Sequence, residues 1–351
     1  MAGSRILIIS FLLFLPVAVQ AEEKYSLPES ITDAEIIPKD RLEETVRNSE
    51  SDTKIQFILG VMYYQGRGVE RNVETAVKYL ENASSGSDSR AALALSYIYL
   101  LGGDIPRNTE KSLDYLKKSA DLKNPKALFQ LAEYYEKGQG VTKDRKKFLE
   151  YLNRAYEVGS FAAAERIAGM YRTGETVKKN PQKAIEIYSY IYANSAEASE
   201  KGASALHISA MYREGKEVAG DEKRGVLWLK RAADAGDADS EARLAALYRD
   251  GKIIGHNDKE ALKYFEMASG NGNKDGDANL GYMYMNGIGT EKNPEKALEH
   301  YKIAAERGSV EAAESLAEIY NTGIGGVKED AEEVEKWRSI AKRNRTAQQK
   351  S

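Results

Sequence analysis

The side chains that most often carry out catalysis or bind metal ions are scarce in this sequence. Cysteine is absent, which excludes disulfides, thiolate zinc sites, iron–sulfur clusters and cysteine nucleophiles. The three histidines, His207, His256 and His300, occupy unrelated positions in the repeating pattern described below. Because nothing in that pattern brings them together, we expect neither a metal ion nor another cofactor.

Other catalytic motifs are also missing. The segments GRG, GQG and GIG resemble phosphate-binding loops, but no P-loop lysine followed by serine or threonine accompanies them. No G-x-S-x-G motif occurs, and adjacent carboxylates such as Glu332 and Glu333 are typical of a solvated helix face. The sequence therefore predicts a binding protein and not an enzyme, with an envelope or cell-wall hydrolase as the competing class.

Arginine is the residue whose spacing suggests a binding chemistry. In three successive segments a basic side chain stands five residues before a tyrosine, and an arginine stands one residue after it. The first set is Arg166, His207 and Arg243, and the second set is Arg172, Arg213 and Arg249. If these segments stack in parallel, the two sets form cationic rows suited to bidentate recognition of carboxylate or phosphate.

The alternative is that acidic neighbours on the same segments neutralise these arginines, since surface ion pairs of this kind are common. The candidate neighbours are Glu165, Glu214, Glu241 and Asp250. The sequence leaves both interpretations open.

Composition favours a folded, soluble protein that does not bind nucleic acid. The 351 residues include 51 basic and 54 acidic side chains, so the formal net charge is −3. No overall positive charge is therefore available to attract a phosphate backbone. Hydrophobic residues make up 42% of the chain, which is too many for a disordered protein.

The first 21 residues have the features of a secretory signal peptide. Arg5 gives a positive start, residues 6–19 are apolar apart from Ser10, and small residues lead up to Ala21. A membrane anchor is the alternative, but a span needs about 20 apolar residues. We expect cleavage after Ala21 and a periplasmic or secreted protein without a membrane span.

The rest of the chain, from residue 53 to about residue 345, repeats one unit. Segments such as LGVMYYQGRGV (59–69) and LAEYYEKGQGV (131–141) recur, each with a tyrosine at the same place, here called the anchor tyrosine. Six of the seven spacings between successive anchors are 36 residues and one is 41. The anchors are Tyr63, Tyr99, Tyr135, Tyr171, Tyr212, Tyr248, Tyr284 and Tyr320. Eight repeats with this spacing indicate a solenoid.

The residues around each anchor predict a helical hairpin. Apolar residues stand four and one before the anchor, on one face of a helix, and the residue three before it is always small. A glycine always stands three after it, as expected at a helix end. A second amphipathic segment follows, opened by Asn, Asp or Asn-Pro in most units. We therefore predict an all-α fold, a right-handed α-solenoid of eight helix-turn-helix repeats of about 36 residues.

This pattern, A-x3-L-G-x2-Y-x2-G-x-G-V followed by K-A-x2-Y/W-Y-x-K-A-A-x2-G, resembles the Sel-one-like repeat, a longer relative of the tetratricopeptide unit. The resemblance covers residues 53–345, nearly the whole chain after the leader. It implies a non-catalytic adaptor or scaffold, in bacteria often periplasmic or secreted, that binds partner proteins.

Three segments depart from the repeat. Residues 22–52 match no unit and suit a polar extension with a capping helix. The five extra residues near 194–202 either lengthen a helix or loop, or alter the path of the solenoid. Residues 346–351 form a polar, basic tail.

We expect the partner on the concave side, which the first helix of each unit lines in solenoids of this kind. The outward positions of the first units are aromatic or apolar, including Tyr64, Tyr97 and Leu100. A contiguous apolar surface indicates a partner site, unless residues 22–52 cover it. The arginine rows of units four to six offer a second surface, for a protein or alternatively for an anionic ligand such as an acidic polysaccharide.

Overall fold

The computed structural model describes residue 46 and residues 52–349. Residues 52–349 form sixteen α-helices and one short 3-10 helix, with no strand among them. The leader at 1–21, nearly all of the extension at 22–52 and the last two residues of the tail lie outside the described residues. Two compact units divide the chain, one ending at Ala163 and one beginning at Ala164, inside helix α10 (Phe161–Thr173).

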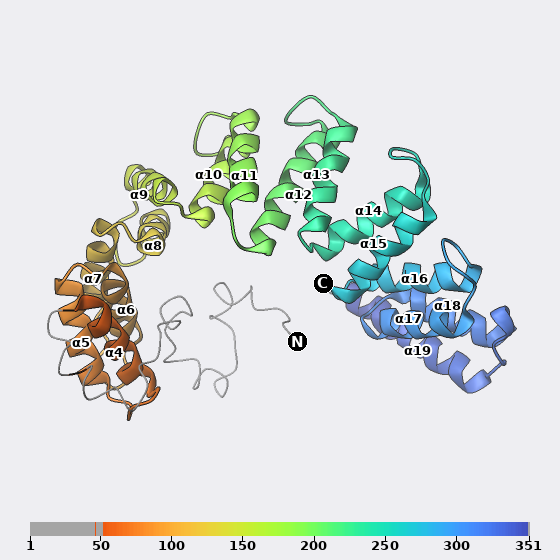
Figure 1. Cartoon of the computed structure of the whole chain (residues 1–351), viewed down its shortest axis with the longest axis horizontal. Helices are drawn as coiled ribbons and strands as arrows, with labels where there is room; N and C mark the ends of the chain where they lie inside the picture. Colours follow the sequence, from red (N-terminus) through yellow and green to blue (C-terminus); the bar gives the residue numbers. More distant parts are fainter. Residues whose placement is uncertain (1–45, 47–51, 350–351) are drawn as a thin grey trace. The chain divides into compact units, whose positions relative to one another are not determined.

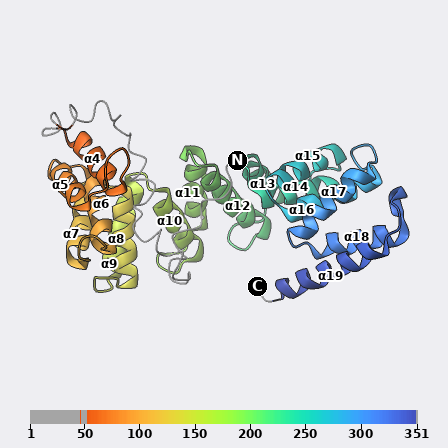
Figure 2. The ribbon, with the colours of Figure 1, turned by 90° about the horizontal axis from the view of Figure 1, so that it is seen from below.

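Helices follow one another in pairs, and each pair is one repeat (Figure 1). The first unit holds α4 (Thr53–Gln65), α5 (Val73–Ser85), α6 (Ser89–Leu101), α7 (Thr109–Asp121), α8 (Pro125–Lys137) and α9 (Arg145–Glu157). The second unit holds most of α10, then α11 (Pro181–Asn194), α12 (Ala198–Glu214), α13 (Glu222–Asp234), α14 (Ala238–Asp250), α15 (Asp258–Gly270), α16 (Lys274–Asn286), α17 (Pro294–Glu306), α18 (Val310–Thr322), η3 (Ile324–Gly326) and α19 (Ala331–Gln348). The predicted all-α solenoid of helix-turn-helix repeats is confirmed. Within the second unit, α16 and α17 pack side by side in both views (Figures 1 and 2).

The anchor tyrosine fixes the start of the second helix in each repeat. Its carbonyl accepts a hydrogen bond from the backbone N–H of the residue that caps the second helix, as in Asn72 N to Tyr63 O (2.9 Å). The Asn72 side chain in turn accepts from the backbone N–H of Thr75 (2.8 Å). The same backbone bond recurs at all eight anchors. Since these caps satisfy N–H groups that a helix start leaves free, they define where the hairpin turns back.

Glycine after the anchor ends the first helix, as predicted. All eight of these glycines have a positive φ, for example 71° at Gly66 and 67° at Gly251. The turn also brings two chain segments together, because a Cβ on Gly251 would lie only 2.7 Å from the Cβ of His256. A larger residue would be strained in conformation and would clash as well.

The predicted buried columns form the core of each unit. Leu59, four residues before its anchor, and Leu80, on the second helix, are both fully buried. The small residue three before the anchor lets the two helices of a repeat approach. A Cβ added to Gly60 would lie 2.6 Å from Leu80, and one added to Gly281 would lie 2.7 Å from the Tyr301 ring. Close helix packing therefore requires these glycines.

Five of the eight anchor tyrosines, in repeats one to three, six and seven, stack on an aromatic ring of their own second helix. Tyr63 lies 5.7 Å from Tyr79, and Tyr284 lies 5.6 Å from His300, with nearly parallel planes. Several anchor rings also have a lysine ammonium group over one face. Lys296 Nζ, for example, lies 5.2 Å from the centre of the Tyr284 ring. The eight anchors and their stacked partners Tyr79, Tyr115, Tyr151 and Tyr264 make up 12 of the 22 tyrosines.

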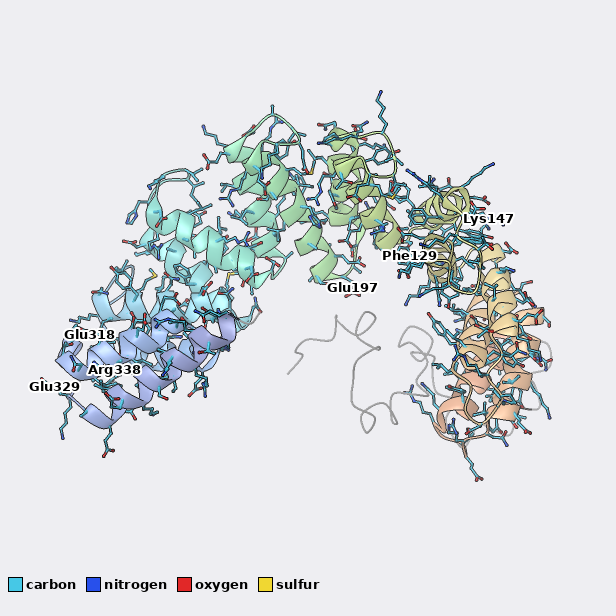
Figure 3. The ribbon with its side chains drawn as sticks, turned by 180° about the vertical axis from the view of Figure 1, so that it is seen from behind. Phe129, Lys147, Glu197, Glu318, Glu329 and Arg338 are labelled. Atoms are coloured by element: carbon cyan, nitrogen blue, oxygen red, sulfur yellow. The ribbon has the colours of Figure 1, made fainter. Side chains whose placement is uncertain are left out.

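The five-residue insertion lengthens helices and does not form a loop. The first helix α12 has 17 residues, whereas the other first helices have 13, and the second helix α11 has 14, one more than α5 or α13. Ser195 joins the two helices: it is buried, its hydroxyl donates to Glu200 (2.6 Å) and accepts from the backbone N–H of Glu197 (3.0 Å). Glu197 marks the start of α12 in Figure 3.

Candidate functional site

Tyr64 does not belong to an exposed surface, so that expectation is wrong. Its side chain is only 3% exposed, and Ile58 and Val61 on the same helix are buried too. Helix α4 carries apolar residues all round, with Phe57, Ile58, Leu59 and Met62 in succession around its axis. A helix that is apolar on all sides is buried on all sides.

Tyr97 and Leu100 on α6 are half-buried. The Tyr97 hydroxyl donates to Gln130 Oε1 on α8 (3.0 Å). Burial, and then the nearby Tyr134 and Glu133, raise the pKa of Tyr97 to about 12. Tyr97 therefore links two repeats, and the partner-binding role of Tyr97 and Leu100 stays a prediction.

The basic residues five before each anchor have different surroundings. Arg166 is exposed on α10. His207 on α12 is half-buried: its ring stacks on Tyr188 at 4.8 Å, and its Nε2 lies 3.8 Å from Glu165 Oε1. Arg243 on α14 is exposed and forms no ion pair with any described residue. His207 therefore packs into the repeat, whereas the two arginines face outward.

The arginines one after each anchor also differ. Arg172 is half-buried, with its Nε 3.9 Å from Glu217 Oε1 in the next repeat. Arg213 is exposed, and its aliphatic stem packs over Gly225, where a Cβ would lie 2.3 Å away. Arg213 makes no ion pair within the described part of the chain. The predicted row is thus interrupted, because position 172 links two repeats while position 213 faces solvent.

The alternative that acidic neighbours on the same helix neutralise the arginines is correct at one position. Arg249 Nε lies 3.1 Å from Asp250 Oδ1. Glu214 pairs with Lys216 at 3.1 Å instead of with Arg213. Glu241 is fully buried and accepts hydrogen bonds from Asn271 Nδ2 at 3.0 Å to each oxygen. The exposed cations Arg213 and Arg243 therefore keep their charge without an acidic partner among the described residues.

Arg249 borders a recess between the sixth and seventh repeats, all within the second unit. The recess measures about 520 Å³ and is open to solvent. It lies between the end of α14, the loop that enters α15, and helix α16. Its lining residues are Arg249, His256, Asp258, Asn279, Tyr282 and Ile288.

The ring of His256, which lines this recess, lies within hydrogen-bond distance of two acceptors. Its Nδ1 lies 2.6 Å from the backbone carbonyl of Arg249, and its Nε2 lies 3.1 Å from Asp258 Oδ2. A neutral imidazole can donate to only one of them, so the geometry favours the doubly protonated ring. The bond to the Arg249 carbonyl, and then Asp258, raise the pKa of His256 above its ordinary value.

The arginine pattern did not identify the other residues of the recess. His256 stands eight after its anchor, where six of the other seven repeats carry a permanent cation such as Lys179 or Lys292 and the fifth has Gly220. Tyr282 stands two before its anchor, where the preceding repeats have Ala210 and Ala246. These departures from the repeat are the signal that could have located the recess. No group of His, Asp or Glu side chains in the described residues could hold a metal ion.

Comparison with known proteins supports the repeat assignment. The Sel1 repeat family matches the chain eight times, at residues 55–88, 89–124, 125–160, 162–191, 203–237, 238–273, 275–309 and 310–333. No curated protein matches the chain. Among the described residues, no helix is both long enough and apolar enough to cross a bilayer.

Similar solved structures share the helical repeat. A protective antigen of uropathogenic Escherichia coli that displays an SLR fold has a TM-score of 0.69 and 24% identity, covering 88% of this chain and 64% of the antigen. This chain thus spans less than two thirds of that protein. A Sel1 repeat protein from Oxalobacter formigenes has a TM-score of 0.49 and 28% identity, covering 67% of this chain and 94% of that protein.

Proposed function

Because this chain belongs to the Sel1 repeat family, whose members generally mediate protein–protein interaction, we propose that it is a non-catalytic adaptor that binds a partner protein. The partner contacts the first helices of repeats in the second unit. The observation that carries this proposal is the pair of exposed cations Arg213 and Arg243, which have no acidic partner in the described chain. Unmatched charges of one sign favour a partner surface of the opposite sign.

The protein acts outside the cytoplasm. The support is the sequence of residues 1–21, a positive start and an apolar stretch followed by small residues that end at Ala21. Fractionation of cells that express the full chain, followed by N-terminal sequencing, tests this. We expect a soluble protein that begins near Glu22; a full-length chain recovered from membranes would contradict it.

Partner capture tests the adaptor role. The mature chain is immobilised and incubated with the envelope fraction of the cells that produce it naturally. Bound proteins are then identified and quantified by mass spectrometry. A variant with Arg213→Ser and Arg243→Ser should capture less partner. The matched control replaces two exposed lysines of second helices, Lys230→Ser and Lys263→Ser. Equal capture by the two double variants would show that the arginines do not bind the partner.

A further inference from the structure

The recess beside Arg249 differs from the corresponding positions of the two preceding repeats. It combines a guanidinium, an imidazole and an aromatic ring that is 49% exposed, Tyr282. Ile288 adds an apolar edge. Large exposed aromatic side chains are unusual on a soluble surface and are enriched where proteins bind.

Arg249 is held in position before any ligand arrives. Its Nη1 donates to Asn279 Oδ1 at 2.5 Å. The amide of Asn279 is itself oriented, because its Nδ2 donates to the backbone carbonyl of Asp275 (2.7 Å). A planar donor group that is already ordered loses less entropy when it binds a carboxylate.

The guanidinium retains donors for a ligand. Of its five N–H groups, one faces Asp250 and one faces Asn279, and no other acceptor among the described residues bonds it. The pair with Asp250 joins a partly exposed arginine to an exposed carboxylate, so it is weak and exchangeable. Asp258 Oδ2 lies 3.1 Å from His256 Nε2, and the doubly protonated ring that this geometry favours offsets the charge of the carboxylate.

We propose that this recess binds the carboxylate of an aspartate or glutamate side chain on a partner protein. The carboxylate accepts N–H groups of Arg249, while the methylene groups of the acid lie on the ring of Tyr282. This inference rests on the proposed function for the source of the ligand, a protein. An acidic side chain fits better than a bare inorganic anion, because Tyr282 and Ile288 offer apolar surface that only a carbon-bearing ligand uses.

The test is an NMR titration of the full mature chain with a blocked pentaglutamate peptide. A pentaglutamine peptide and inorganic phosphate, at matched ionic strength, are the comparison ligands. Pentaglutamate should shift the side-chain signals of Arg249 Nε and Asn279 and the ring signals of Tyr282. Arg249→Gln should weaken this binding at least about tenfold, as expected for a charge-assisted bond. Tyr282→Ala should weaken it, and Tyr282→Phe should retain it.

The matched control is Lys230→Gln, which removes an exposed cation from the second helix of the fifth repeat and should leave the titration unchanged. Thermal melts confirm that each variant folds. Equal shifts with pentaglutamine or with phosphate, or unchanged binding in Arg249→Gln, would overturn the proposal. If the wild type captures a partner and Arg249→Gln captures it equally well, the proposed binding of a carboxylate in the recess is refuted. The adaptor function then still stands. Failure to capture any protein would refute the adaptor function, while the peptide titration would still report on the recess.

Discussion

Asp277 on α16 and Arg307 at the end of α17 form an ion pair that closes the seventh repeat. The carboxylate is fully buried, and Arg307 Nη1 bonds its Oδ2. Ser269 donates to the other oxygen (2.6 Å), and His300 Nδ1 lies 3.3 Å from it. Burial alone would raise the pKa of Asp277, but the bonds from His300 and Ser269 and the charge of Arg307 outweigh it and lower the pKa. The charged form is therefore the one that stabilises the fold.

We expect Asp277→Asn to lower the free energy of unfolding by about 1.5–3 kcal/mol near neutral pH, because hydrogen bonds to a charged group are lost. The pKa of Asp277 is lower in the folded chain than in the unfolded chain, so its contribution is present above the unfolded value of 3.8 and is lost as the pH falls through the folded value. Urea unfolding at neutral and acidic pH measures both. A constant difference between wild type and variant at all pH values would contradict this.

Glu241 should behave in the opposite way. It is the buried acid at the equivalent position of the sixth repeat, and burial raises its pKa although Asn271 donates to it. A raised pKa stabilises the fold below the unfolded value of 4.5 and costs stability as the pH rises through the folded value. We therefore expect Glu241→Gln to be more stable than the wild type near neutral pH and equal to it in acid. Lower stability near neutral pH would show that the charged form is stabilised.

Two glycine-to-alanine substitutions distinguish the effect of close helix packing on stability from the effect of helix propensity. Gly281→Ala should destabilise the chain by about 1–3 kcal/mol, because its Cβ would lie 2.7 Å from the Tyr301 ring. Gly169→Ala is the control, since nothing lies within 4 Å of its Cβ, and alanine favours a helix by about 1 kcal/mol. Thermal melts should move in opposite directions. A common direction would refute the close approach at Gly281.

The repeat itself could be predicted because its determinants are local. The spacing of Tyr63 and Gly66, and the buried partner Leu80, follow from the helical period and from turn chemistry within one hairpin. The binding surface could not be predicted in this way. Tyr64 and Arg213 both follow an anchor, yet one is buried and the other exposed, because the composition of the whole helix and its neighbours decides which face remains open.

The recess was missed for a related reason. Its residues come from two repeats and a loop, so no spacing within one repeat joins Arg249 to Tyr282 or to Asn279. His256 carried a signal only as a deviation from a position that is a lysine or arginine in six of the other seven repeats. Three-dimensional stacking, and not the period, brings these side chains together.

His256 should make the sixth repeat sensitive to pH. The pKa of His256 is raised in the folded chain, first by the Arg249 carbonyl and then by Asp258. Its contribution is therefore complete below the unfolded value of 6.5 and is lost as the pH rises through the folded value. We expect the melting temperature to fall over this range in the wild type and less in His256→Lys, which keeps a charge there as in the seventh repeat. An NMR titration of the ring that gives a pKa at or below 6.5 would contradict this.

Arg172 and Arg213 occupy equivalent positions, but we expect the first to contribute to stability and the second to partner binding. Arg172 is half-buried against Glu217 of the next repeat, whereas Arg213 is exposed without an acidic partner in the described chain. Arg172→Ser should therefore lower stability by about 1 kcal/mol, and Arg213→Ser by less than about 0.5 kcal/mol. Partner capture should fall in Arg213→Ser, and in the wild type it should weaken with rising salt, because exposed charges are screened beyond about 8 Å at physiological ionic strength. Urea unfolding measures the stability of the two variants, and capture assays at two salt concentrations measure their partner binding. Capture that is independent of salt and unaffected in Arg213→Ser would show that the exposed arginine is only a solvated side chain.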